Sequence, residues 1–258
     1  MSALLVALAA AVAVVAAARS TWSPCGLSML STITPMGERA RRYTYGGTAA
    51  WFVVGAILGG ATLGLGAAVL AAGVGALDFD TSTAVGIAGV LCLVTAASDA
   101  ELGGRRLPGH RRQVNEMWLD RYRSWVYGAG FGWQIGVGLA TFIVTAAVYL
   151  MIAVAALTGE PAVAFLVCTG FGLLRGLAVL LSRHATTPER LQALHRRFDA
   201  LSVPSRVATI AAQLALAAVA AVVAGGPIAA AGVGVVAIAA VIAARGRPAV
   251  SALRTRAG

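Results

Sequence analysis

Long apolar runs separated by short polar segments dominate the chain. A bilayer crossing needs about 20 apolar residues in a helix. The run at 207–244 would measure about 57 Å as one helix, which is too long for one crossing. Gly225-Gly226-Pro227 supplies a turn within it, so the pattern predicts two crossings, at 207–224 and 228–244. The other apolar runs are 1–18, 20–37, 43–77, 81–98, 124–159 and 161–182.

Basic and non-basic segments alternate between these runs. Arginine-rich segments follow the first, third and fifth crossings, acidic residues follow the second and fourth, and nothing charged follows the sixth. Since basic loops stay in the cytoplasm, we predict seven crossings with the N-terminus outside and the C-terminus cytoplasmic. Residues 1–18 leave two alternatives open. They are a signal peptide, although no positive charge precedes the run, or an eighth crossing that places the N-terminus inside.

Composition supports an all-α integral membrane protein. Of 258 residues, 59% are hydrophobic and 12% are charged, and the mean hydropathy is +0.83. A soluble domain carries about twice that charged share, so these values exclude a water-soluble enzyme, a disordered chain and a disulfide scaffold. The net charge of +10 comes from arginine without lysine and follows the loops. It therefore indicates orientation in the lipid bilayer rather than nucleic-acid binding, and the arginine bias favours a bacterial inner membrane.

Two cytoplasmic segments are amphipathic. In 187–201, leucine and phenylalanine recur at helical spacing after Thr187 and Pro188, which suit a helix start. We expect both segments to lie in the headgroup region, with docking of a partner protein as the alternative. The second stripe consists of Val114, Trp118, Tyr122 and Trp125.

The segment 20–37 carries most of the chemical information. Pro24 and Pro35 predict an interrupted helix within the membrane, because proline lacks a backbone donor. Broken backbone at that depth is tolerated only where protein or a water-filled cavity satisfies it. Ser28, Thr32 and Pro35 share one helical face, which suggests a functional surface or, alternatively, hydrogen bonding between helices.

The stretch Trp22-Ser23-Pro24-Cys25 resembles the Ser-Pro-Cys motif of the DsbD/CcdA-type transmembrane thiol-relay proteins. In that family a cysteine in the first helix of each of two three-helix repeats passes reducing equivalents across the membrane. The family's second motif is similar to the stretch Gly132-Trp133-Gln134-Ile135-Gly136 at the start of the fourth crossing. The resemblance implies two three-helix repeats plus one appended helix, with broken first and fourth helices.

The second motif departs from the family pattern. Gly136 stands where the second cysteine is expected, and Ile135 stands where its proline is expected. Dithiol–disulfide exchange needs a second thiol, so an intramolecular relay requires Cys92 or Cys168, both of which we expect to be small buried hydrophobes. Cys25 is the candidate reactive thiol, and its partner would be a thioredoxin-like or other membrane protein.

Two arginines lie within apolar runs, where a charge is costly and faces a cavity or a partner. Arg19 lies six residues before Cys25, where it would favour a thiolate or receive an anionic substrate. Arg175 either snorkels to the cytoplasmic surface or meets Asp99. If residues 1–18 form a separate crossing, Arg19 is an interfacial anchor.

No metal site and no cofactor are expected, because all three histidines lie in predicted cytoplasmic loops. The lone membrane amides, which we expect to bond between helices, are Gln134 and Gln213. The candidate substrate path comprises Arg19, Trp22, Pro24, Ser28, Thr32, Pro35, Trp133, Gln134, Gly136 and Arg175.

The sequence favours a translocator on a DsbD/CcdA-like scaffold, which would move a small solute or thiol-borne reducing equivalents. Two alternatives remain: a single-cysteine thiol relay for cytochrome c biogenesis, and a non-catalytic membrane assembly subunit. The expected divisions are a first repeat at 1–98, a basic loop at 99–123, a second repeat at 124–224, and a seventh helix with a basic tail at 225–258.

Overall fold

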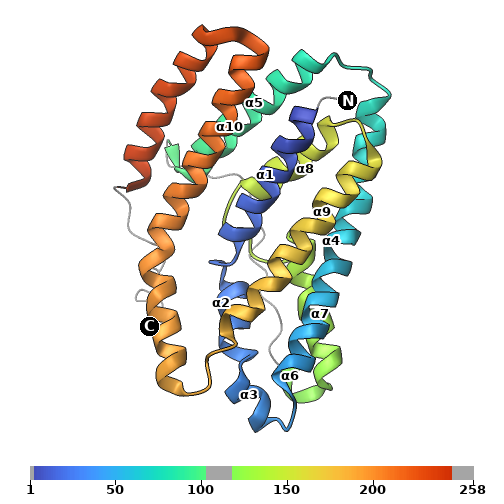
Figure 1. The fold of residues 1–258 in the computed structure, drawn as a ribbon, viewed down its shortest axis with the longest axis vertical. Coiled ribbons are helices and arrows are strands. Elements are labelled where there is room, and N and C mark those ends of the chain that lie inside the picture. The colour runs from blue at the N-terminus through green and yellow to red at the C-terminus, as the bar shows by residue number, and fades with distance from the viewer. Residues whose placement is uncertain (1–2, 103–117, 246–258) are drawn as a thin grey trace.

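The computed structural model describes residues 3–102 and 118–245, and within these ranges the regular structure is helical. Figure 1 shows an elongated bundle whose longer helices follow one long axis. The helices are α1 (Ala3–Ser20), α2 (Pro24–Thr32), α3 (Pro35–Ala40), α4 (Tyr45–Gly75), α5 (Thr81–Asp99), α6 (Trp118–Arg121), α7 (Ser124–Val137), α8 (Ala147–Leu157), α9 (Pro161–Leu177), the 3-10 turn η2 (Ala178–Ser182) and α10 (Pro188–Arg245).

Within the part of the chain that the structure describes, five helices are long and apolar enough to cross a membrane. They are α1, α4, α5, α9 extended by η2, and α10 over Pro188–Gly225. The backbone of α10 is assigned as one helix to Arg245, and Figure 1 shows its ribbon bending sharply at the upper end. The predicted amphipathic segment 187–201 forms the first turns of α10 instead of a separate helix. The count of seven crossings remains a prediction.

The helix that begins the chain is interrupted between Ser20 and Pro24. Ser23 has extended backbone and caps α2, because its hydroxyl accepts a hydrogen bond from the Gly26 amide at 3.1 Å. Pro24 occupies the first turn of α2, where a missing amide hydrogen costs nothing. The same arrangement recurs at α3, where Thr34 is the cap and Pro35 follows it. Hydroxyl–proline pairs therefore restart the helix twice.

A second interruption separates α7 from α8. Gly138 has a φ of +72°, a backbone conformation that favours glycine, and it ends α7. Residues 139–146 then run without regular helix until α8 begins at Ala147. The apolar run at 124–159 is thus two helices joined by an irregular segment.

Helices α4, α7 and α9 pack so closely that only glycine fits at their contacts. A Cβ atom at Gly132 would collide with the Phe52 carbonyl oxygen, and one at Gly136 with the Ala56 carbonyl oxygen. Gly172 of α9 lies against Ala56 in the same way. Small residues allow this backbone approach in membrane helices.

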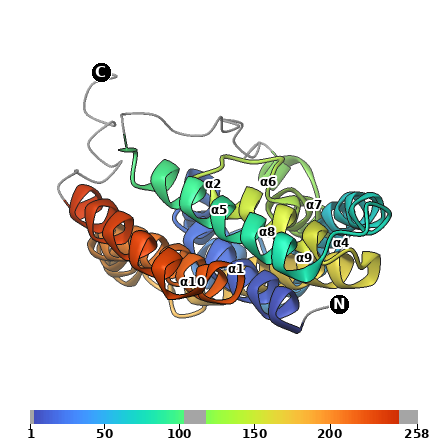
Figure 2. The same ribbon diagram turned by 90° about the horizontal axis from the view of Figure 1, so that it is seen from above.

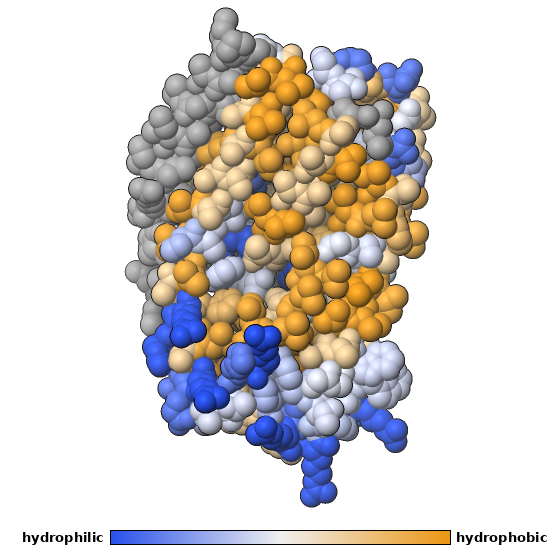
Figure 3. Space-filling view, in the orientation of Figure 1, coloured by the Kyte–Doolittle hydropathy of each residue, from blue (hydrophilic) through white to orange (hydrophobic). Residues whose placement is uncertain are grey.

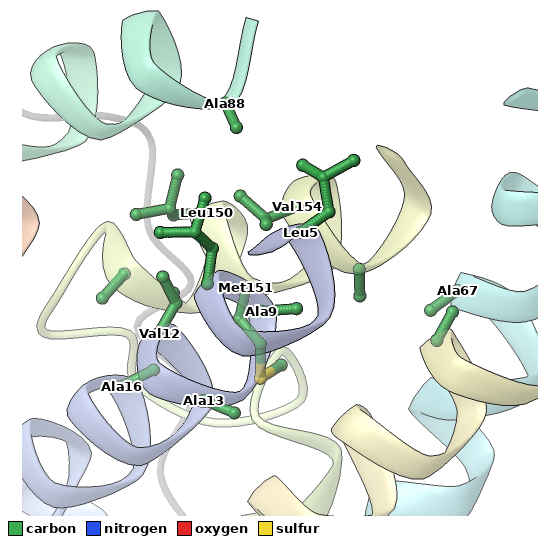
Figure 4. Close-up of a cluster of buried hydrophobic side chains, with 14 of the residues drawn as sticks. Leu5, Ala9, Val12, Ala13, Ala16, Ala67, Ala88, Leu150, Met151 and Val154 are labelled. Carbon is green, nitrogen blue, oxygen red and sulfur yellow. The ribbon is translucent and has the colours of Figure 1, made fainter. Parts of the chain in front are cut away.

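The remaining helices form a second part of the bundle. Helix α5 packs on α10, while α1 packs on α8 and α9, as the view from above in Figure 2 shows. Figure 4 shows Leu5, Ala9 and Val12 of α1 meeting Met151 and Val154 of α8 in an apolar cluster.

The surface is apolar around the bundle, as a lipid environment requires. Figure 3 shows a broad hydrophobic region on one face, with hydrophilic side chains at the lower end and at the upper right edge. Leu65, Val69 and Leu166 are each more than 60% exposed. The apolar helices and this surface establish a membrane protein. Residues 103–117, which include Val114 and much of the predicted basic loop, and the predicted tail at 246–258 lie outside the described residues.

Candidate functional site

Cys25 lies buried in the first turn of α2, with 2% of its surface exposed. Arg175 of α9 interacts with it electrostatically. Arg175 is 3% exposed, donates a hydrogen bond to the Ile135 carbonyl oxygen at 2.7 Å, and lies 5.7 Å from the centre of the Phe171 ring. The structure therefore brings together the Cys25 thiol, the Arg175 guanidinium and the end of α7, although Cys25 and Arg175 are 150 residues apart in the sequence.

Arg19 and Trp22 both contact α10. Arg19 donates a hydrogen bond to the Ser205 hydroxyl at 3.2 Å. The Trp22 indole donates to the Phe198 carbonyl oxygen at 2.9 Å, and the two rings are 5.1 Å apart. The break before Pro24 therefore places Trp22 against the amphipathic start of α10.

The hydroxyl face of α2 is occupied by local contacts. Thr32 donates to the Ser28 carbonyl oxygen at 2.9 Å, within its own helix. Ser31 donates to the Leu27 carbonyl oxygen and lies 2.9 Å from Nε2 of His195 on α10. Pro35 begins α3 and is buried.

The three candidate path residues on α7 lie in different environments. Trp133 is 42% exposed, and its indole donates to the Thr62 hydroxyl at 3.1 Å. Gln134 is half-buried, and Gly136 lies against the α4 backbone. The sequence-derived candidates thus do not line one shared cavity. A cavity of about 180 Å³ lies elsewhere, at the end of the bundle that holds Asp78, Phe79 and Glu160, and none of these candidates lines it.

A buried polar cluster surrounds Asp99, at the C-terminal end of α5. Its carboxylate accepts hydrogen bonds from the Thr145 hydroxyl at 2.5 Å, the Ala146 amide at 2.7 Å and Nε2 of Gln213 at 3.1 Å. Arg19 is the charged side chain that acts on it electrostatically. The expected pairing of Asp99 with Arg175 is wrong, because these two residues belong to different clusters.

A second buried carboxylate, Glu38, ties α3 to α4 and α7. It accepts hydrogen bonds from the Tyr127 hydroxyl at 2.6 Å and the Thr48 hydroxyl at 2.5 Å, and it pairs with Arg41 at 3.1 Å. Sequence inspection missed this network, because Glu38 stands among arginines in what looks like a cytoplasmic loop. The only available signal was an acidic residue in an otherwise basic segment.

The thiols are separate from one another. Cys25, Cys92 and Cys168 are all buried and none forms a disulfide. Among the side chains that the structure describes, which lie in 3–102, 118–119 and 121–225, no three His, Cys, Asp or Glu residues come together in a way that could hold a metal ion.

The fold and these buried clusters define a multi-pass helical membrane protein. Comparison with known proteins narrows the class. The chain is 30% identical over 179 residues to the methylamine utilization protein MauF of Paracoccus versutus, an alignment that covers 67% of this chain and 64% of the relative. It is 31% identical over 189 residues to MauF of Paracoccus denitrificans, with 71% and 66% covered.

A third relative is MauF of Methylorubrum extorquens, 29% identical over 171 residues, with 63% of this chain and 58% of the relative covered. The chain therefore spans a little less than two thirds of these relatives' own length. No protein-family model and no solved structure matches the chain.

These relatives correct two expectations from the sequence. Their consistent naming as methylamine utilization proteins gives no support to membership of the DsbD/CcdA family, and that identification is wrong. The translocator function, with its transport and cytochrome c biogenesis roles, was inferred from that resemblance and is wrong with it. The short Ser-Pro-Cys stretch was misleading because Ser-Pro is also an ordinary helix start.

Proposed function

We propose that this chain is a membrane assembly subunit that serves methylamine utilization and has no catalytic role of its own. The observation that carries the proposal is its similarity to several proteins named for methylamine utilization, over most of the chain. Methylamine utilization is the role printed in the names of those relatives, and assigning it to this chain is part of the proposal.

Two features of the structure favour assembly over chemistry. The candidate thiol Cys25 is almost fully buried, beside a guanidinium that is itself bonded to the Ile135 carbonyl. The residues expected to form a path lie apart. Trp133 is exposed on α7, Gly136 lies within a contact between helices, and Trp22 packs against α10. The partner in assembly would be a separate membrane or thioredoxin-like protein.

We further propose seven crossings in two three-helix units, within residues 1–98 and 124–224, joined by the loop 99–123 and followed by 225–258. Both units begin with an interrupted helix, α1–α2 and α7–α8, which supports the division. The charged ends support a bacterial inner-membrane location with a cytoplasmic C-terminus. Arginines mark one end at 39–42 and 183–197, and carboxylates mark the other at 78–80 and 160.

The test is deletion of the gene in its host, followed by growth on methylamine as the sole nitrogen source. We expect growth on methylamine to stop while growth on ammonium continues, and the wild-type gene to restore it. A Cys25→Ser gene should restore growth as well, because the thiol has no chemical task in this proposal. Unimpaired growth of the deletion strain would contradict the methylamine role. Failure of Cys25→Ser at normal protein abundance would contradict the non-catalytic role.

A further inference from the structure

The Asp99 cluster has features that an assembly role does not explain. Asp99 projects from the end of α5 to the N-terminus of α8, where the Ala146 amide donates to Oδ1. The positive end of a helix dipole and charge-assisted hydrogen bonds both stabilise an ionised carboxylate. Asp99 is 9% exposed, so this carboxyl group is held inside the bundle.

An acceptor oxygen next to this carboxyl group has no hydrogen-bond partner. Gln213 is 1% exposed; its Nε2 donates to Asp99, and its Oε1 is unsatisfied. Oε1 and Nε2 are bonded to the same carbon atom, so Oε1 lies next to the nitrogen that donates to the Asp99 carboxylate. A buried polar atom without a partner in a native structure calls for a bound species to satisfy it.

A second unsatisfied oxygen lies on the segment that meets Asp99. The Thr141 hydroxyl is fully buried and has no partner, four residues before Thr145, which donates to Asp99. Both threonines belong to the irregular stretch between α7 and α8. Unwound backbone and helix ends of this kind coordinate alkali ions in other membrane proteins.

We propose that Asp99 and Gln213 form a binding site for a monovalent cation of the size of Na⁺. The acceptors at the site are the carboxylate oxygens of Asp99 and Oε1 of Gln213, and oxygen ligands suit a hard cation. Arg19 on α1 already places one positive charge in the field of Asp99, so a singly charged ion fits better than a divalent one.

The experiment uses the full chain purified in detergent and measures binding of ²²Na⁺ at constant ionic strength, with choline as the replacing cation. Thermal unfolding is followed under the same conditions. We expect saturable binding and a higher unfolding temperature in Na⁺ than in choline, because an ion that binds the folded state stabilises it. Absence of both effects would overturn the proposal and leave a water molecule as the partner of Gln213.

Three variants locate the site. Gln213→Leu removes one ligand and should weaken binding by about tenfold or more. Gln213→Glu adds a carboxylate and should strengthen it, a result that a purely structural hydrogen bond would not produce. Gln134→Leu changes the other membrane amide, on α7, and should leave binding unchanged. Binding that is equal in the wild type and in Gln213→Leu would overturn the assignment to this cluster. These readouts do not involve growth on methylamine, so they are independent of the proposed function.

Discussion

Individual residues in this protein show how one amino-acid type can serve opposite purposes. Gly136 is required by a helix contact, since any side chain would strike the Ala56 carbonyl. Gly66 on α4 has open space where a Cβ would be. Of the two arginines within the apolar runs, Arg175 faces a thiol and Arg19 faces a carboxylate. Side-chain type alone did not distinguish these cases, because the neighbours come from other helices.

The difference between Gly136 and Gly66 gives a prediction about single residues. Gly136→Ala should lower stability by about 1–3 kcal/mol, because overpacking forces α4 and α7 apart. Gly66→Ala should be neutral or slightly stabilising, because alanine favours the helix and meets no neighbour. Thermal unfolding of the two variants in the same detergent would measure the difference. Equal stability would mean that α4 and α7 are less closely packed than the structure indicates.

At the level of elements, the starts of helices are the feature that the sequence predicts most clearly. Ser23, Thr34 and Asp80 each have extended backbone and cap the helix that follows. Two of these starts also carry proline, so the interruption around Pro24 follows from local chemistry. The end of α7 depends on Gly138 and on what the next residues pack against, which made it harder to predict.

The cap of α5 predicts a response to pH. Hydrogen bonds from the side chain and amide of Thr83 hold the pKa of Asp80 below its usual value of 3.8. A depressed pKa means that the cap stabilises the folded state above pH 3.8 and is lost as the pH falls below that value. Hydrogen exchange at the Thr83 amide should accelerate over this range beyond its intrinsic pH dependence. Asp80→Asn should abolish the extra acceleration, since asparagine caps without titrating.

The whole molecule is organised by the separation of its charged ends. Arginines gather at 39–42 and 183–197, whereas 78–80 and 160 carry carboxylates without arginine, and apolar side chains face outward from the helices between them. The interior is held by small residues and by two buried carboxylates, Glu38 and Asp99, which lie in separate clusters. This arrangement predicts a single orientation in the membrane.

Orientation can be measured by side-specific labelling, because all three native cysteines are buried. Arg42→Cys should react with a membrane-impermeant maleimide only from the cytoplasmic side. Asp78→Cys should react only from the outer side, in intact cells. Both native positions are exposed, so failure to react is not explained by burial. Labelling of both from one side would contradict the predicted topology.

The class of protein, the main apolar spans and the interruption at Pro24 could be predicted from the sequence, because hydropathy, helix length and proline act over a few residues. The contacts between side chains that are far apart in the sequence could not be predicted in this way. Asp99 meets Gln213 across 114 residues of sequence, and Cys25 interacts electrostatically with Arg175 on a distant helix. Such contacts depend on how helices are rotated and how closely they pack, and the close approach of α4, α7 and α9 through their glycines is one example. The local sequence therefore determined where the helices lie, and only the tertiary structure decided which buried charges and oxygens meet.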